Sequence, residues 1–281
     1  MRTLGQWLDY QQGLHPQAID MGLDRVREVA HRLGLLPLAA RSAIVGGTNG
    51  KGSTASMLAA LGSAHGLRTG LFTSPHLLRY EERIQVDAMP AEAARICAAF
   101  EQVEAARQGV SLTYFEFNTL AALLLFREAG AALVVLEVGL GGRLDATNIV
   151  DADVAVLCSV DFDHREWLGD TLEQIGAEKA GIFRPGQHVV LGRDDLPPTV
   201  GAAVERLGCR AEAAGRDFQW RRHPDGSWDF LHPRARLERL PPPALVGDIQ
   251  YRNAATALAA WIDLVPGVAP ADAAIRAALE A

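Results

Sequence analysis

The sequence has few of the features that mark secreted, membrane or nucleic-acid-binding proteins. Its three cysteines lie far apart and in no metal-binding spacing, which fits a reduced, cytosolic compartment. No apolar run approaches the roughly 20 residues that span a bilayer, and the first residues are too polar for a signal peptide. Basic residues number 27 against 34 acidic ones, so the formal net charge is −7. Because nucleic acids and anionic membranes attract basic surfaces, we predict a soluble, cytoplasmic protein with neither kind of partner.

The composition of the 281 residues, 49% hydrophobic and 22% charged, is typical of a globular protein. Short runs rich in Val and Leu alternate with segments whose apolar residues recur at helical spacing. The runs show little polar alternation, which is typical of parallel strands covered on both faces. This order predicts a three-layer α/β domain with a mostly parallel central sheet. The expected strands are 42–45, 69–72, 132–138, 154–160 and 188–191, and the expected helices are 53–65, 91–107 and 117–128.

The last quarter of the chain has a different character. Segments 218–222 and 228–231 flank Pro224-Asp225-Gly226 and predict a β-hairpin, followed by an extended proline-rich stretch, 240–245. Helices are expected at 253–261 and 271–279. We expect a small β appendage on the same sheet rather than a second complete domain. The predicted organisation is an N-terminal helical segment (1–40), an α/β core with a phosphate loop (41–208), the β appendage (209–245) and a helical end (246–281).

A glycine-rich turn separates the first strand from its helix. Its glycines would let backbone N–H groups approach phosphate oxygens, the helix N-terminus would add positive charge, and Lys51 would reach the outer phosphates. Ser53 is the expected N-cap of the helix. The turn departs from the general Walker pattern at Val45 and Gly52, and the alternative is a structural turn with a solvated lysine. We predict a nucleotide site formed by Gly47, Thr48, Asn49, Gly50, Lys51, Gly52 and Ser53.

Several polar residues stand where the α/β pattern places a ligand crevice. Glu137 ends an apolar strand, and a buried carboxylate there must be paired or bound to a metal. With His164, which follows the next strand, and with ATP oxygens, it would suit Mg²⁺ or Mn²⁺. From the residues alone, Glu137 could equally form a strand-end salt bridge, and His164 could be a loop histidine. Lys179 could simply answer a helix dipole, and Asn253 could be a helix N-cap.

The turn Gly47–Ser53 resembles the phosphate loop of the Mur-ligase superfamily, specifically of its folate branch, the folylpolyglutamate and dihydrofolate synthases. Similar segments occur in the same order along nearly the whole chain, which implies the fold of the Mur-ligase central domain. These segments are Leu14-His15-Pro16, Ile19-Asp20-Met21-Gly22-Leu23, Thr73-Ser74-Pro75-His76-Leu77, Glu82-Arg83-Ile84, Leu112-Thr113-Tyr114-Phe115-Glu116, 137–148, 163–164, 167–169 and 178–182.

The resemblance implies roles for single residues. Ser74, Glu137 and His164 match the magnesium ligands of the family, and Lys179 matches a carbamylated lysine that supports the second magnesium. Gln250 and Asn253 match the adenine side, although Ile249 stands where many relatives carry histidine. The pterin side of the bifunctional bacterial members is matched by Thr113, Phe115 and Asp145. The residues alone would make Phe115 a core side chain and Asp145 a turn residue.

The activity implied by the resemblance is ATP-dependent amide ligation. ATP would phosphorylate the carboxylate of dihydropteroate or the γ-carboxylate of a folate, and L-glutamate would attack the acyl phosphate. Lys51, Lys179 and His164 would serve this chemistry, with Lys51 and magnesium neutralising phosphoryl charge. Alternatives are a peptidoglycan Mur ligase, a nucleotide-binding module without a complete reaction, and a kinase that phosphorylates a small acid.

Family members carry a second domain of about 130 residues, a size within the usual domain range. No motif of that domain occurs in this sequence. We therefore expect these residues to fold alone as a monomer and to bind nucleotide without completing ligation.

Overall fold

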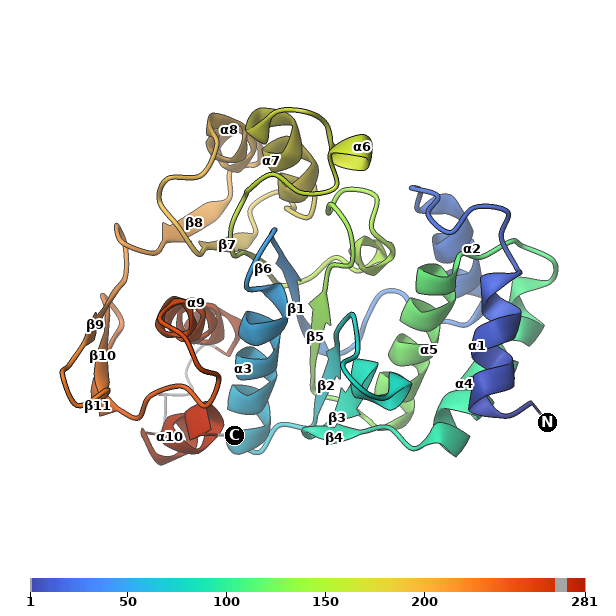
Figure 1. The fold of residues 1–281 in the computed structure, drawn as a ribbon, viewed down its shortest axis with the longest axis horizontal. Helices are drawn as coiled ribbons and strands as arrows, with labels where there is room; N and C mark the ends of the chain where they lie inside the picture. Colours follow the sequence, from blue (N-terminus) through green and yellow to red (C-terminus); the bar gives the residue numbers. More distant parts are fainter. Residues whose placement is uncertain (1, 266–271, 281) are drawn as a thin grey trace.

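A twisted eight-stranded sheet forms the centre of the molecule (Figure 1). The computed structural model describes residues 2–265 and 272–280. The strand order is β4-β3-β2-β5-β1-β6-β7-β8, parallel from β2 to β8, with β3 and β4 added antiparallel at one edge. The predicted mostly parallel sheet is confirmed. The strands are β1 (Arg41–Gly46), β2 (Thr69–Phe72), β3 (Ile84–Val86), β4 (Met89–Pro90), β5 (Leu133–Glu137), β6 (Val154–Leu157), β7 (His188–Leu191) and β8 (Arg210–Ala213).

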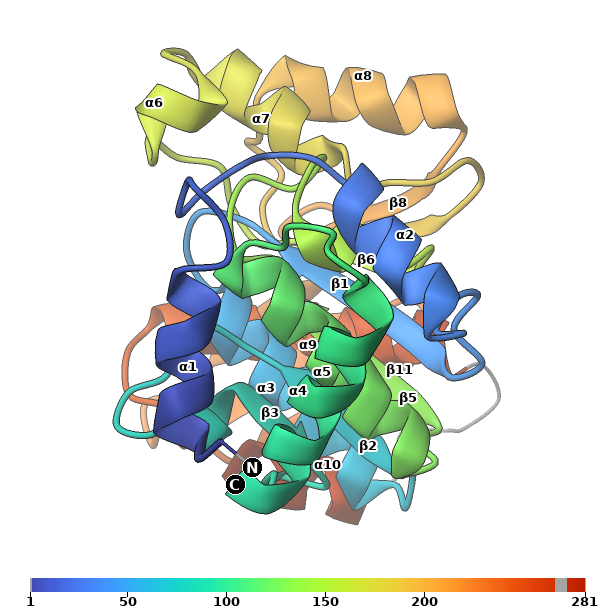
Figure 2. The same cartoon turned by 90° about the vertical axis from the view of Figure 1, so that its right-hand side faces the viewer.

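Helices cover both faces of this sheet, which gives the three layers predicted. One face packs on α3 (Lys51–Ala64), α9 (Ile249–Leu264) and α10 (Asp272–Glu280). The other packs on α1 (Leu4–Gln12), α2 (Asp24–Arg32), α4 (Ala93–Arg107) and α5 (Tyr114–Glu128), which Figure 2 shows in front of the sheet, and on α7 (Leu172–Ala180) and α8 (Pro198–Leu207). Neighbouring residues of one strand face opposite layers: Val45 packs with α3, whereas Ile44 packs in the cluster beneath α7 and α8. Three short helices complete the elements, η1 (Tyr80–Arg83), η2 (Ala146–Ile149) and α6 (Arg165–Leu168).

The β appendage is a separate sheet rather than part of the central one. Strands β9 (Gln219–Arg222), β10 (Trp228–His232) and β11 (Ala235–Leu240) pair antiparallel, and Trp228 and Phe230 are buried with α9. The predicted hairpin is therefore confirmed. The expectation that the appendage continues the same sheet is wrong beyond β8, because the apolar face of β9–β11 packs on α9.

The predicted helix cap at Ser53 is wrong, and so is the alternative interpretation of Asn253 as a helix cap. Helix α3 begins at Lys51 with Gly50 at its N-cap, so Ser53 lies inside the first turn. Helix α9 begins at Ile249 after Asp248, so Asn253 lies inside it and is not a cap. The start predicted for the last helix, Ala271, and residues 266–270 lie outside the described residues. Within residues 2–265 and 272–280, every helix is too short or too polar to cross a membrane.

Candidate functional site

The glycine-rich turn lies at the carboxyl end of β1, between that strand and α3. Gly50 has a φ of 86°, and a Cβ atom there would lie 2.7 Å from Asn253 Oδ1. Gly47 has a φ of 142°, and a Cβ there would lie 3.1 Å from the Ser159 nitrogen. Both positions need glycine because the backbone is left-handed or extended with positive φ and tightly packed. The turn thereby leaves the N-terminus of α3 at the carboxyl ends of the parallel strands, the geometry that binds phosphate.

The turn is tied to the segment that follows β6. The Thr48 N–H donates to the Ser159 carbonyl (2.9 Å), and the Asn49 N–H donates to Ser159 Oγ (2.9 Å). The Ser159 hydroxyl donates in turn to the Asn49 carbonyl (3.0 Å). Lys51 Nζ donates to the carbonyls of Gly47 (2.9 Å) and Thr48 (3.2 Å). The lysine charge is therefore held over a loop of fixed shape.

Helix α9 brings the predicted adenine-side residues against the same loop. Asn253 is buried, its Nδ2 donates to Gln250 Oε1 (2.9 Å), and its Oδ1 faces Gly50. Sequence separation of 200 residues is thus closed by direct packing of α9 on the phosphate loop.

Glu137 ends β5 beside the first turn of α3. Its carboxylate is 4% exposed, and Oε2 accepts a hydrogen bond from the Ser74 backbone N–H (2.9 Å). Burial raises the pKa of Glu137, while the Ser74 N–H and the charge of Lys51 oppose that rise. Gly52 and Ser53 line a cavity of ≈ 510 Å³ with Glu137 and Ser74, and a Cβ at Gly52 would lie 3.4 Å from Glu137 Oε1.

Glu137 and Ser74 fit a site for a divalent ion that is also bound by oxygen atoms of a ligand. Across the described residues, no three His, Cys, Asp or Glu side chains converge closely enough to hold a metal by themselves. Mg²⁺, however, is usually bound by one or two carboxylates together with substrate phosphates and water. A buried carboxylate of raised pKa beside Ser74 and the phosphate loop matches that requirement. The strand-end salt-bridge alternative has no support, since Glu137 forms no ion pair within the described chain.

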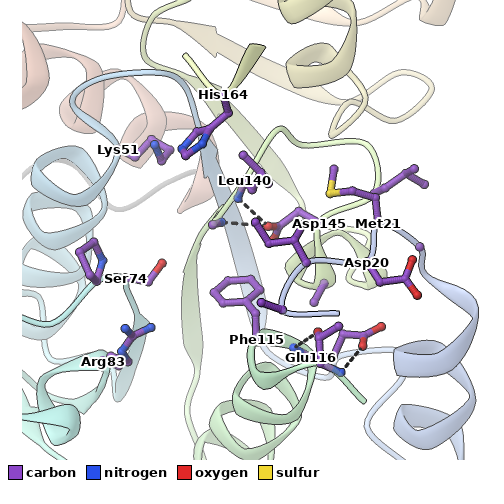
Figure 3. A pocket seen from close by; sticks show the side chains of 18 residues that line it. Asp20, Met21, Lys51, Ser74, Arg83, Phe115, Glu116, Leu140, Asp145 and His164 are labelled. Atoms are coloured by element: carbon purple, nitrogen blue, oxygen red, sulfur yellow. Dashed lines mark hydrogen bonds between the residues drawn. The ribbon is translucent and has the colours of Figure 1, made fainter. Parts of the chain in front are cut away.

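His164 and Lys179 approach the site from beyond β6. His164 is the N-cap residue of α6 with a φ of 46°, and its side chain, 49% exposed, faces Lys51 at one end of the cavity (Figure 3). Lys179 is only 3% exposed, and burial, with help from the Lys51 charge, lowers its pKa to about 8. Its neighbour Glu178 pairs with Arg143 instead (2.8 Å). Lys179 is therefore a buried amine, and its place in the last turn of α7 also fits the helix-dipole alternative.

A cavity of ≈ 420 Å³ joins the phosphate-loop end to the predicted pterin side (Figure 3). Phe115, on the first turn of α5, packs its ring over Gly139, where a Cβ would lie 2.7 Å from the ring, and lies 5.6 Å from the ring of Phe72. Thr113 caps α5 by accepting from the Glu116 N–H (3.3 Å). The residues that line this cavity include Lys51, Ser74, Arg83, Thr113, Phe115, Glu116, Asp145 and His164.

Asp145 is both a turn residue and a residue of the cavity wall, the two interpretations that the sequence offered. Its buried carboxylate accepts from the N–H groups of Gly139 (3.0 Å), Leu140 (2.9 Å) and Thr147 (3.0 Å) and from Thr147 Oγ1 (2.6 Å). Burial raises its pKa, and the hydrogen bonds from Thr147 and the two other N–H groups oppose this. Asp145 thus stabilises its own turn, as expected of a turn residue, and it also lines the cavity.

Sequence reasoning assigned no role to several lining residues. Asp20, Arg83 and Glu116 all face the same cavity. Arg25 joins two of them, with Nη1 at 2.6 Å from Asp20 Oδ2 and Nη2 at 3.3 Å from Glu116 Oε1. Each lies in or near a family-like segment, which was the only available signal, because their meeting depends on how α2, α5 and the loops pack.

Comparisons with known proteins show which family shares this sequence and fold. Residues 45–261 match the Mur ligase middle domain. The chain belongs to the Mur ligase family. That match covers the phosphate loop, Glu137, His164, Lys179 and most of α9, so the site described above lies almost entirely within the family's shared region.

The individual relatives lie in the folate branch. The chain is 46% identical over 257 residues to the dihydrofolate synthase/folylpolyglutamate synthase of Escherichia coli (strain K12), which covers 92% of this chain and 60% of that protein. The structure of E. coli FolC in complex with DHPP and ADP superposes with a TM-score of 0.93 at 43% identity, over 99% of this chain and 66% of that one. The structure of a bifunctional folylpolyglutamate synthase/dihydrofolate synthase with Mn, AMPPNP and L-glutamate bound superposes with a TM-score of 0.90 at 43% identity. The superposition covers 100% of this chain and 66% of that one. The chain thus spans about three fifths of its E. coli relative's length.

Proposed function

We propose that this chain serves an ATP-dependent amide ligase that joins L-glutamate to dihydropteroate, to the γ-carboxylate of folates, or to both. The observation that carries the proposal is the single cavity in which Lys51 and His164 meet Phe115 and Asp145. A phosphate-binding end and an end suited to a flat heterocycle share one space, as transfer of a phosphoryl group to a carboxylate requires. The relatives solved with ADP and DHPP, and with Mn, AMPPNP and L-glutamate, support the same ligand classes.

The residues of the phosphate loop would hold the nucleotide. Backbone N–H groups of the turn and the N-terminus of α3 would bind its phosphates, and Lys51 would neutralise charge on the phosphoryl group in transfer. Gln250 and Asn253 would lie on the adenine side, since α9 packs directly on the loop. Ser74, Glu137 and His164 would hold Mg²⁺, which supplies charge neutralisation and orientation of phosphate oxygens.

Lys179 would act through a carbamate. Carbamylation needs a neutral amine, and a buried Lys179 with a pKa of about 8 supplies far more of it near neutral pH than an exposed lysine does. The resulting carboxylate would carry negative charge toward Lys51 and the second metal.

The acid substrate would occupy the rest of the cavity. Phe115 would stack on the pterin, whose N–H groups would donate to Asp145, and Thr113 would close the same end. Transfer of the γ-phosphoryl group of ATP to the carboxylate of the acid would release ADP. The amine of L-glutamate would then attack the acyl phosphate and release inorganic phosphate, so no protein nucleophile is required.

Two titrations and one product analysis test the proposal. ADP with Mg²⁺ and pteroate should both bind the wild-type chain; Lys51→Ala should weaken only the first, and Phe115→Ala only the second. This chain is not expected to complete ligation by itself, so product analysis with ATP, dihydropteroate and glutamate is run with the family's second domain added in trans, and it distinguishes the alternatives. A glutamyl amide supports the proposal, whereas phosphorylation of the acid without need of an amine acceptor favours a kinase. Nucleotide binding without pteroate binding would refute the folate assignment.

A further inference from the structure

Arg83 lies on the wall of the cavity next to the predicted metal side. It is the last residue of η1, directly before β3, and its carbonyl accepts from the Thr73 N–H (2.9 Å). Its side chain is half-buried and lines the cavity with Ser74, across from Phe115 and Asp145 (Figure 3). The backbone bond fixes the place from which the guanidinium enters the cavity.

The Arg83 charge lowers the pKa of Glu137, but its direct contacts are a histidine and two tyrosine rings. Nε donates to Nδ1 of His76 (2.7 Å). The Cζ atom lies 5.9 Å from the ring centroid of Tyr80 and 5.8 Å from that of Tyr114. Among residues 2–265 and 272–280, no carboxylate forms an ion pair with Arg83. Arg25, on the far side of the same cavity, is by contrast paired with two.

Arg83 therefore offers terminal Nη donors to the cavity. A guanidinium that forms no ion pair with the described residues, in a partly enclosed site, is stabilised by an anionic ligand. Lys51 is less available for this task, because its Nζ already donates to two loop carbonyls.

We infer that Arg83 binds the carboxylate of the acid substrate, the group that receives the phosphoryl group. The inference rests on the proposed function and adds to it the residue that orients the acid. The planar fork of arginine matches the two oxygens of a carboxylate. Asp145, at the other end, would repel a carboxylate and accept from ring N–H groups. The two residues together therefore set one direction for the substrate, with its heterocycle on Phe115 and its carboxylate beside Ser74 and Lys51.

A comparison of pteroate with its carboxamide, pteroamide, tests this pairing. The two ligands differ only in the charge of the group assigned to Arg83. Their dissociation constants are measured by calorimetry on the wild-type chain, Arg83→Gln, Arg83→Lys and Arg79→Gln. Arg79 is the matched control, since it is an exposed arginine four residues earlier that does not line the cavity.

We expect Arg83→Gln to weaken pteroate binding by about 10- to 100-fold, the range for a charged hydrogen-bonded pair, and pteroamide binding by less than threefold. Arg83→Lys should retain part of the preference for the carboxylate, and Arg79→Gln should retain all of it. Unchanged binding of ADP and an unchanged melting temperature will show that the variants are folded.

Equal losses for both ligands in Arg83→Gln, or no loss for either, would overturn the inference while leaving the proposed function intact. No binding of pteroate to the wild-type chain would overturn the proposed function and the inference with it.

Discussion

Replacing Lys179 by methionine should stabilise the ligand-free protein at neutral pH, and the gain should disappear as the pH rises. Lys179 is buried, which lowers its pKa from 10.5 to about 8. The unfolded chain keeps this proton until about pH 10.5, whereas the folded chain loses it near pH 8. Because the unfolded state then binds more protons, the free energy of unfolding of the wild type must rise between these two values.

The size of the effect follows from the two pKa values. A difference of about 2.5 units at 1.36 kcal/mol each is about 3 kcal/mol. Below pH 8 the wild type bears this penalty in full, and above pH 10.5 it bears none. Methionine is unbranched, fills similar space and carries no charge, so Lys179→Met should be up to about 3 kcal/mol more stable at pH 7.

Urea unfolding at pH 7, 8.5 and 10, without nucleotide or divalent ions, measures the gap between the two proteins. The sequence has only two lysines, Lys51 and Lys179, so reductive ¹³C-methylation yields two lysine signals, and Lys51→Ala assigns them. We expect the Lys179 signal to titrate near pH 8. A signal that titrates near 10.5, or a gap that does not change with pH, would refute the reasoning. With ¹³C-labelled bicarbonate, a carbamate signal should appear in the wild type and be absent from Lys179→Met.

Four further variants test the rest of the site. Lys51→Ala should lower kcat for phosphoryl transfer by about 10³ with a smaller effect on ATP affinity, and turnover near that of the wild type would make the loop merely structural. Gly50→Ala should weaken ADP binding at least about tenfold, because the new Cβ would meet an amide oxygen at 2.7 Å; Gly66→Ala, at a similar φ of 78° but in open space, should cost only about 1 kcal/mol of stability and leave ADP binding unchanged. Phe115→Ala should raise KM for dihydropteroate about tenfold and spare KM for ATP, and unchanged values would reduce Phe115 to core packing. Glu137→Gln should raise the free energy of unfolding of the ligand-free protein at pH 7, because burial raises the pKa of Glu137 and its ionised form is therefore unfavourable when folded; the same variant should need more Mg²⁺, and lower stability in thermal melts would contradict this.

Much of the fold could be predicted because its signals are local. The apolar run 69–72 coincides with β2, and 188–191 with β7, since central parallel strands are continuous runs of Val, Leu and Phe between turn residues. The run 154–160 was predicted too long: β6 ends at Leu157, because Ser159 turns away to bond the phosphate loop. The cap at Ser53 was wrong for a similar reason, because the N-cap of α3 is Gly50, which packs against Asn253 from a distant helix.

The sequence by itself determined most strands of the parallel sheet, the phosphate loop and the family, because hydrophobic runs, glycine turns and long family-like segments can be read along one stretch of chain. Only the tertiary structure decided which side chains meet. Lys51, Ser74, Phe115 and Asp145 share one cavity because β1, β2 and β5 are neighbours in the sheet although they are far apart in the chain. The burial that lowers the pKa of Lys179 could not be predicted from the sequence either, because burial depends on several segments packing together and no single segment encodes it.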